Sequence, residues 1–220
     1  MSLSGNHNSN AASTMTYIGI GSNLNQPIQQ VLTALKSLAK LPNSRLLAQS
    51  SLYRSHALKV PKVADTGSAE PNPIDTGLIG TRAIESDQAI ESPAAAQNDY
   101  INAVAKLETR LPAEQLLLAL QAIEQSHGRI RKQRWEPRPL DLDILLYGDQ
   151  TIATDTLNVP HPEISKRHFV LYPLAEIAPE LIMPYDISLA DLLKRCPIDE
   201  LAIVELASET TSNTAPSAGE

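Results

Sequence analysis

Residues 129–147 read RIRKQRWEPRPLDLDILLY, and they divide into a basic first half and an apolar second half. Only Asp141 and Asp143 interrupt the apolar half. Successive side chains of a β-strand point to opposite faces, so a strand here places both carboxylates on one face and Leu142 and Ile144 on the other. The sequence therefore predicts a partly buried strand that presents a pair of carboxylates on a rigid support.

A carboxylate pair of this kind suits a hard divalent cation. Mg²⁺ commonly takes one or two protein carboxylates and fills its other positions with phosphate oxygens and water. The basic side chains that precede the pair suit a phosphate-bearing ligand that the metal also binds. The spacing D-x-D is nevertheless short and common, and a solvated sheet face with arginines in surface ion pairs explains it equally well.

The composition of the whole chain makes this basic cluster a local feature. The 220 residues carry a formal net charge of −7, which argues against a general binder of nucleic acid or anionic membranes. The single cysteine, Cys196, offers neither an internal disulfide nor a cysteine metal site. The polar start has no signal-peptide core, and no apolar run is long enough to span a bilayer. We expect a soluble cytoplasmic protein.

Changes in composition along the chain indicate one domain with additions. Residues 1–15 are rich in Ser and Asn, and we expect a flexible leader there. Residues 59–98 combine Pro and Gly with scattered polar residues and predict a long mobile insert. Residues 205–220 predict a disordered tail. The remaining chain within 16–204 is expected to form a single domain.

Hydrophobic periodicity and turn residues predict the elements of that domain. The core elements are, in order, a strand at 17–20 ending in a Gly21-Ser22-Asn23 turn, a helix capped by Asn25 and carrying Ile28, Leu32, Leu35 and Leu38, strands at 45–54 and 99–108, a helix that Pro112 opens and Gly128 ends, and the strand of the carboxylate pair. A strand at 151–158, a short helix or turn at 163–170 and a helix at 188–196 follow. The order strand, helix, strand, strand, helix, strand is the split βαβ pattern of a ferredoxin-like α/β (α+β) sandwich, with antiparallel strands and packed helices. This fold alone does not decide a function.

Residues 134–145, RWEPRPLDLDIL, resemble the signature of the 6-hydroxymethyl-7,8-dihydropterin pyrophosphokinases, enzymes of folate biosynthesis. Supporting matches keep the order of that family: IGSNL at 20–24, SLYR at 51–54, DYIN at 99–102, GRIRK at 128–132 and VPH at 159–161. The resemblance implies a transferase that binds ATP with two Mg²⁺ ions and a pterin. It would transfer a pyrophosphoryl group from ATP to the hydroxymethyl oxygen of the pterin and release AMP.

The resemblance also implies roles for individual residues. Asp141 and Asp143 match the ligands of the two metal ions, and the catalytic set adds Arg129 and Arg138. The expected ATP-binding residues are Gln121, Glu124, Arg131, Lys132, Arg134, Ile144, His161 and Arg167. The expected pterin-binding residues are Ser55, Leu58, Tyr100, Asn102, Trp135 and Phe169. Gln121 and Glu124 are equally consistent with exposed helix positions. Tyr53 could stack on the pterin beside Phe169, but it is also consistent with a core aromatic residue.

Some positions depart from the family pattern. Glu136 stands where a small residue is usual, the basic loop is one residue shorter than in familiar members, and His56 and Pro162 replace other residues. The insert follows the expected pterin loop directly, which suggests the hypothesis of an enlarged lid. Two other functions fit parts of the sequence: an RNA-binding ferredoxin-like module and a nucleotide-sugar transferase that uses D-x-D for its metal. The acidic balance and single Phe speak against the first, and the length speaks against the second. We expect a monomer without nucleic-acid or membrane partners.

Overall fold

The computed structural model describes residues 12–56, 98–128, 139–198 and 201–206. Most of the predicted leader, insert and tail therefore lies outside the described residues, as does the basic segment 129–138. At the N-terminal boundary, the first strand begins at Thr14, two residues before the predicted start of the domain.

The central sheet has the predicted ferredoxin-like topology. Its strands run in the order β10-β3-β4-β1-β5, β2 also pairs with β4, and every pair is antiparallel. The strands are β1 (Thr14–Ser22), β2 (Ser44–Gln49), β3 (Tyr53–Ser55), β4 (Tyr100–Thr109), β5 (Asp141–Tyr147) and β10 (Ala202–Ile203). The helices are α1 (Pro27–Leu38), α2 (Ala113–Ser126), α3 (His168–Ile177) and α4 (Leu189–Arg195). Because β5 pairs only with β1, it is an edge strand among the described residues.

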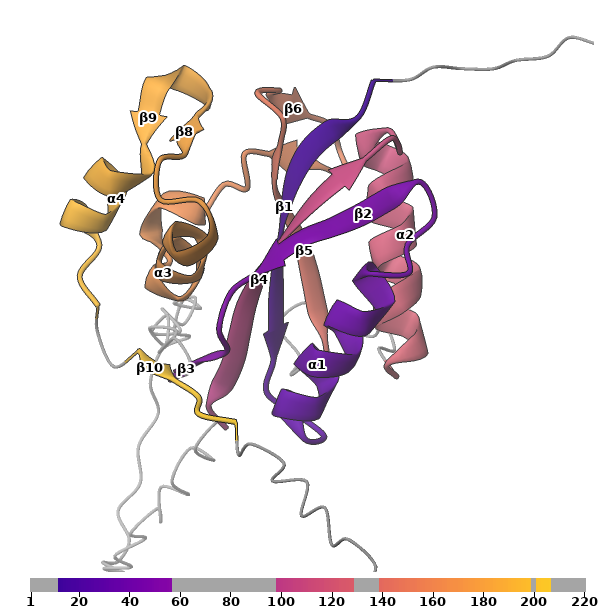
Figure 1. The fold of residues 1–220 in the computed structure, drawn as a ribbon, viewed down its shortest axis with the longest axis vertical. Helices are drawn as coiled ribbons and strands as arrows, with labels where there is room; N and C mark the ends of the chain where they lie inside the picture. Colours follow the sequence, from indigo (N-terminus) through magenta and orange to yellow (C-terminus); the bar gives the residue numbers. More distant parts are fainter. Residues whose placement is uncertain (1–11, 57–97, 129–138, 199–200, 207–220) are drawn as a thin grey trace, which may run out of the picture. The chain divides into compact units, whose positions relative to one another are not determined.

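The sheet carries helices on both faces. Figure 1 shows α1 and α2 on one side and α3 and α4 on the other. The first face buries alternate residues of the central strands, among them Ile18, Ala103 and Ile144, against α1 and α2. The opposite face buries Tyr17 and Val104 against α3 and α4. A strand covered on both faces reads as a nearly continuous apolar run, which is how β4 appears in the sequence.

Strand β5 contains a bulge between the carboxylate pair and the apolar residues at its end. The pairing with β1 shifts by one residue beyond Ile144, so Leu145 is the extra residue. Leu142 and Ile144 lie in the α1/α2 core, whereas Leu145 and Leu146 both lie in the α3/α4 core. Before the bulge the alternation is regular, and the prediction that both carboxylates share the face opposite Leu142 is confirmed.

Two predictions around β1 and α1 are wrong. The expected turn at Gly21 and Ser22 is part of β1, which continues to Ser22. Asn25 does not cap α1: the N-cap is Gln26, without a side-chain hydrogen bond, and both residues have left-handed backbone angles. Pro27 then supplies the first helical φ and needs no N–H partner at that position, which makes a side-chain cap less necessary.

The predicted strand at 45–54 is two strands, β2 and β3, that share β4 as neighbour. Ser50 lies at the break, where its hydroxyl accepts the Val104 N–H at 2.9 Å. Its backbone N–H donates to the Val104 carbonyl, also at 2.9 Å. A side chain thus replaces one backbone acceptor, so the chain bends without leaving a buried N–H unpaired.

The end of the chain was predicted less well. The strand expected at 151–158 is a hairpin of two short strands, β6 (Ile152–Ala153) and β7 (Asn158–Val159). The short helix or turn expected at 163–170 is wrong in extent, because the single turn η1 (Ile164–Lys166) leads into α3. A second hairpin that was not predicted comprises β8 (Ile182–Met183), η2 (Pro184–Asp186) and β9 (Ile187–Ser188).

Two helix ends have well-defined caps, and the first was predicted. Gly128 follows α2 with φ +85°, a conformation that glycine adopts without strain, and its N–H donates to the Gln125 carbonyl. Ser188 caps α4 by accepting the Asp191 N–H at 3.2 Å. Within the described ranges, none of the helices combines the length and apolar character that crossing a membrane requires.

Candidate functional site

The carboxylate pair lies beside two glycines. In the antiparallel pairing of β1 and β5, Asp141 is opposite Gly21 and Asp143 is opposite Gly19. Residues opposite each other in a sheet point to the same face, so the neighbours of both carboxylates on that face have no side chain. The side chain of Asp143 is 40% exposed, which leaves it accessible to a ligand.

The two glycines form a strip without side chains between β5 and β4, open at Gly21 and packed against the Leu145 side chain at Gly19. A Cβ atom at Gly21 would lie 3.6 Å from Asn102 Oδ1, and one at Gly19 would lie 3.2 Å from Leu145 Cδ2. Any larger side chain at Gly21 would therefore extend against Asn102. Neighbouring strands are spaced by about 4.8 Å, so Asp141 and Asn102 are separated by roughly 10 Å across Gly21.

Asn102 and Ser55 form the far side of this strip. Asn102 is only 6% exposed and donates from Nδ2 to Ser55 Oγ at 2.9 Å. This bond orients the amide so that Oδ1 faces Gly21. Tyr100 lies opposite Ser55 in the pairing of β3 and β4 and alternates onto the face of Asn102. The three residues predicted for pterin binding on these strands are thus brought together.

His161 reaches the carboxylate pair from the segment after β7. Its Nε2 lies 3.9 Å from Asp143 Oδ2, and its backbone N–H donates to the Leu145 carbonyl at 3.0 Å. The Glu163 N–H donates to His161 Nδ1 at 3.1 Å, which assigns the proton of the neutral ring to Nε2. Burial holds the pKa of His161 below its usual value of 6.5, and the charge of Arg167 lowers it further against the opposing effects of Glu163 and Asp141. The imidazole is therefore a neutral donor that points toward the carboxylates.

Arg167 and Phe169 lie at the start of α3. The guanidinium carbon of Arg167 is 5.9 Å from the centre of the Phe169 ring, and the His168 ring meets that ring edge-on at 5.5 Å. Phe169 packs partly against the α3/α4 core, on the same side of the sheet as the carboxylates. The charge of Arg167 also contributes to lowering the pKa of His161.

The donor set fits a metal that is completed by a ligand. Among the residues whose positions are described, none group as three or more His, Cys, Asp or Glu side chains able to hold an ion. Two carboxylates on one strand face are too few for an all-protein site. They match the way Mg²⁺ binds when phosphate oxygens and water complete the shell.

Three predicted ATP-binding residues have unequal surroundings. Gln121 is half-buried on α2, and the Ile144 side chain is 3% exposed within the α1/α2 core, which leaves its backbone for a ligand. Glu124 is not an exposed helix residue: it is 2% exposed and accepts the Leu142 N–H at 2.8 Å. The other predicted residues, Arg129, Arg131, Lys132, Arg134, Trp135, Arg138 and Leu58, lie outside the described residues, as does Glu136.

Tyr53 has a structural role that its position in the sequence left open. It is 8% exposed, and its hydroxyl donates to Glu176 Oε2 at 2.9 Å. Burial, followed by the bond and the charge of Glu176, raises the pKa of Tyr53 to about 12. Glu176 also accepts from the backbone N–H and hydroxyl of Ser51. This carboxylate ties α3 to the start of β3, and no local motif in the sequence indicates it.

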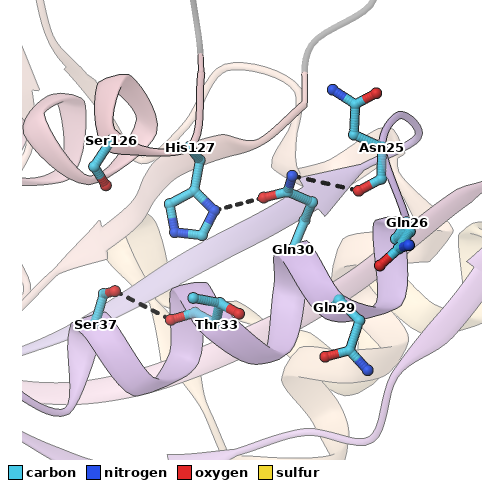
Figure 2. A pocket seen from close by; sticks show the side chains of 8 residues that line it. All are labelled: Asn25, Gln26, Gln29, Gln30, Thr33, Ser37, Ser126 and His127. Atoms are coloured by element: carbon cyan, nitrogen blue, oxygen red, sulfur yellow. Dashed lines mark hydrogen bonds between the residues drawn. The ribbon is translucent and has the colours of Figure 1, made fainter.

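A separate polar pocket lies between α1 and α2, on the sheet face opposite the carboxylates (Figure 2). Figure 2 shows the His127 ring directed at Gln30, with 2.5 Å between His127 Nδ1 and Gln30 Oε1. Gln30 in turn donates to the Asn25 carbonyl at 3.4 Å. The pocket contains no residue predicted for catalysis, so the carboxylate face remains the candidate site.

His127 gives stability a predictable pH dependence. Burial lowers its pKa below 6.5, so the unfolded chain binds this proton at a higher pH than the folded chain. The contribution of the neutral His127 ring to the free energy of unfolding is therefore fully present above the pKa of the unfolded chain. It is lost as the pH falls from there toward the lower pKa of the folded chain. We expect the free energy of unfolding in urea to decrease between about pH 7.5 and pH 5.5, and to decrease less in His127→Gln. Any slope that remains in the variant includes the contribution of His161, and identical slopes in both proteins would contradict the assignment.

Comparisons with known proteins point to one enzyme family. The sequence model of the family described as 7,8-dihydro-6-hydroxymethylpterin-pyrophosphokinase (HPPK) matches residues 74–179. A 2-amino-4-hydroxy-6-hydroxymethyldihydropteridine pyrophosphokinase of Haemophilus influenzae is 39% identical over 179 residues, which cover 81% of this chain and 91% of the relative. A protein of the same name from Pseudomonas aeruginosa is 40% identical over 183 residues, covering 83% and 92%.

Solved structures share the fold. The wild-type HPPK-DHPS protein of Plasmodium falciparum has a TM-score of 0.54 at 14% identity, covering 86% of this chain and 42% of that one. The present chain thus spans less than half the length of that protein. The two bacterial relatives, in contrast, are matched over nearly their whole length at 39% and 40% identity. The chain belongs to the 7,8-dihydro-6-hydroxymethylpterin-pyrophosphokinase family.

Proposed function

We propose that this protein transfers the pyrophosphoryl group of ATP to 6-hydroxymethyl-7,8-dihydropterin, in folate biosynthesis. The hydroxymethyl oxygen forms a bond to the β-phosphorus, the bond from that phosphorus to the oxygen bridging to the α-phosphate breaks, and AMP leaves. The hydroxyl proton is lost from the pterin. The observation that carries the proposal is a carboxylate pair on the sheet face of Asn102, with Asp141 directly across Gly21 from that amide.

Asp141 and Asp143 are proposed to hold two Mg²⁺ ions together with phosphate oxygens. Bound Mg²⁺ offsets the charge on the phosphates and supports their alignment for transfer. The protein supplies a fixed strand, because Leu142 and Ile144 anchor it in the α1/α2 core between and beside the two carboxylates. A rigid support keeps the ligand atoms in place without reorganisation during the reaction.

His161 and Arg167 are proposed to contact ATP phosphates. The neutral His161 ring presents Nε2–H toward Asp143, where a phosphate oxygen bound to the metal would accept it. Arg167 adds a permanent positive charge on the same side. The basic residues Arg129, Arg131, Lys132, Arg134 and Arg138 keep their predicted phosphate roles, and Gln121 and Ile144 their predicted places near the nucleotide. Glu124 is instead buried and accepts the Leu142 N–H of β5.

The pterin is proposed to lie on the glycine strip. The Asn102 amide offers an acceptor and a donor, Oδ1 and Nδ2, to the polar edge of the ring, and Ser55 fixes its orientation. The separation of roughly 10 Å between Asn102 and Asp141 leaves room for a flat bicyclic ring whose hydroxymethyl group points to the metal. Phe169 is proposed to stack on the ring from α3, with Tyr100, Leu58 and Trp135 completing the pocket.

The test is AMP release from ATP and Mg²⁺, with and without 6-hydroxymethyl-7,8-dihydropterin, while mass spectrometry follows the pterin. Pterin-dependent AMP and a diphosphorylated pterin are expected. AMP release that does not depend on pterin, or an unmodified pterin, would overturn the proposal. The comparisons lend no support to an RNA-binding module, and a gel-shift experiment with single-stranded RNA is expected to show no complex.

A further inference from the structure

Strand β5 is an edge strand among the described residues, and Glu124 of α2 reaches the backbone of its outer side. Its inner side pairs with β1, and that ladder ends at the pair of Gly21 and Asp141. An edge strand has a row of backbone groups with no strand partner, and the end of such a strand frays unless other groups hold it. Asp141 is the first residue of β5, so one proposed metal ligand sits at the position where the strand is least supported by the sheet.

Two buried side chains hold the backbone around Asp141. Glu124 of α2 is 2% exposed, and its Oε1 accepts the Leu142 N–H at 2.8 Å. Ser22 at the end of β1 is fully buried, and its hydroxyl donates to the Pro139 carbonyl at 2.5 Å. The Leu140 side chain between them is fully buried in the α1/α2 core. The segment 139–142 is thus fixed at three points from two directions.

A buried Glu at position 124 destabilises the fold unless its carboxyl group makes hydrogen bonds such as the one to Leu142. Burying a carboxyl group is unfavourable unless hydrogen bonds compensate for the lost water, and a helix position facing a strand is normally apolar. Its neighbours on the buried stripe of α2, Leu116 and Leu120, follow that rule and are fully buried. The Glu124 oxygen accepts the Leu142 N–H and so replaces the strand partner that this edge position lacks.

We propose that Glu124 and Ser22 are positioning residues that fix the β5 backbone so that Asp141 and Asp143 keep the spacing of a metal-binding pair. This inference rests on the proposed metal role of these two aspartates. Groups that orient metal ligands commonly change metal affinity or activity by about 10 to 100-fold when they are removed. Glu124 would act through the Leu142 amide, so its effect should appear in the backbone as well as in the enzyme.

The experiment compares Glu124→Gln with Glu124→Met. Gln keeps an oxygen acceptor for the Leu142 N–H, whereas Met has a similar volume and no comparable acceptor. Hydrogen exchange of the Leu142 amide is expected to accelerate at least about tenfold in Glu124→Met and to stay near the wild-type rate in Glu124→Gln. The Val104 amide, which bonds Ser50 Oγ in another strand, is the internal reference for a general loss of stability.

Metal binding provides the second measurement. In the presence of a non-hydrolysable ATP analogue, the apparent Mg²⁺ affinity of Glu124→Met is expected to fall about 10 to 100-fold, with Glu124→Gln close to wild type. Ser22→Ala is expected to weaken it in the same direction. Ser37→Ala is the matched control, because that hydroxyl bonds the Thr33 carbonyl on the exposed side of α1. The KM for ATP at saturating Mg²⁺ should change little in all variants.

Contrary results are easily distinguished. An equal loss of ATP affinity in Glu124→Gln and Glu124→Met, with normal Leu142 exchange, would show that Glu124 contacts the nucleotide and would overturn the positioning role. Parallel acceleration at Leu142 and Val104, with unchanged Mg²⁺ affinity, would reduce Glu124 to a stability residue. Absence of pterin-dependent AMP release in the wild-type enzyme would instead overturn the proposed function. The two failures can be told apart, because hydrogen exchange at Leu142 does not depend on catalysis.

Discussion

Replacing Asp143 by Asn is expected to lower Mg²⁺-dependent pyrophosphoryl transfer by about 100-fold or more while the protein remains folded. The substitution keeps the size of the side chain and removes the charge that balances the metal. The Asp143 side chain is 40% exposed, and the core contacts of β5 come from Leu142 and Ile144 on the other face. The folding energy is therefore largely independent of this carboxylate. Initial rates over a range of Mg²⁺ concentrations, together with urea unfolding, measure both quantities.

Asp149→Asn is the matched control for this change. Asp149 is exposed in the turn that follows β5, so the variant removes one negative charge from the same region without touching the site. It is expected to keep wild-type activity. Normal activity of Asp143→Asn at ordinary Mg²⁺ concentrations would show that the metal is held elsewhere. A loss of activity accompanied by an equal loss of folded protein would assign a structural role to Asp143.

The elements that the sequence predicted well have strong local signals. Helix α2 combines an apolar stripe with Pro112 before it and Gly128 after it, and each signal refers to residues within the helix or beside it. The carboxylate face followed from strand alternation alone, since Leu142 and Ile144 had to face a core. The order of the core elements then limited the topology to the ferredoxin-like pattern that the structure shows.

The elements that the sequence predicted poorly depend on contacts between distant residues. The break between β2 and β3 exists because Ser50 bonds Val104, which lies in another strand. The extent of α3 depends on packing against the second face of the sheet, and its internal Pro173 weakens any local helix signal. Local propensity has no access to either contact.

The same division applies to the candidate site. Asp141, Asp143, Asn102 and His161 could be proposed as site residues because the motifs that resemble the family include them. Glu124 was assigned to the nucleotide on that basis, whereas its bond to the Leu142 amide could be seen only in three dimensions. The two glycines of β1 were likewise interpreted as part of a strand end and a turn. Their importance lies in the neighbours that face them across the sheet.

Substitution of Gly21 is therefore expected to have a large effect on pterin binding. We expect Gly21→Leu to lower kcat/KM for the pterin by about 100-fold, because the side chain would lie where the ring is proposed to bind. A Cβ atom at this position is already 3.6 Å from Asn102 Oδ1, an ordinary contact, and the remaining atoms of Leu extend beyond it over the strip. A ring lifted from the strip loses its two hydrogen bonds to the Asn102 amide, and two bonds of about 1.4 kcal/mol each correspond to a factor of about 100.

Gly21→Ala separates bulk from backbone effects. Its Cβ fits at 3.6 Å, and Gly21 is not among the glycines with positive φ, so this variant is expected to bind pterin within about threefold of wild type. Calorimetric titration with the pterin, and separately with an ATP analogue and Mg²⁺, distinguishes the two subsites. Gly21→Leu should weaken pterin binding by about 100-fold and leave nucleotide binding nearly intact. Equal pterin affinity in the Ala and Leu variants would place the pterin away from the glycine strip. Loss of nucleotide binding in the Leu variant would show instead that the phosphates of ATP, and not the pterin, lie on the glycine strip.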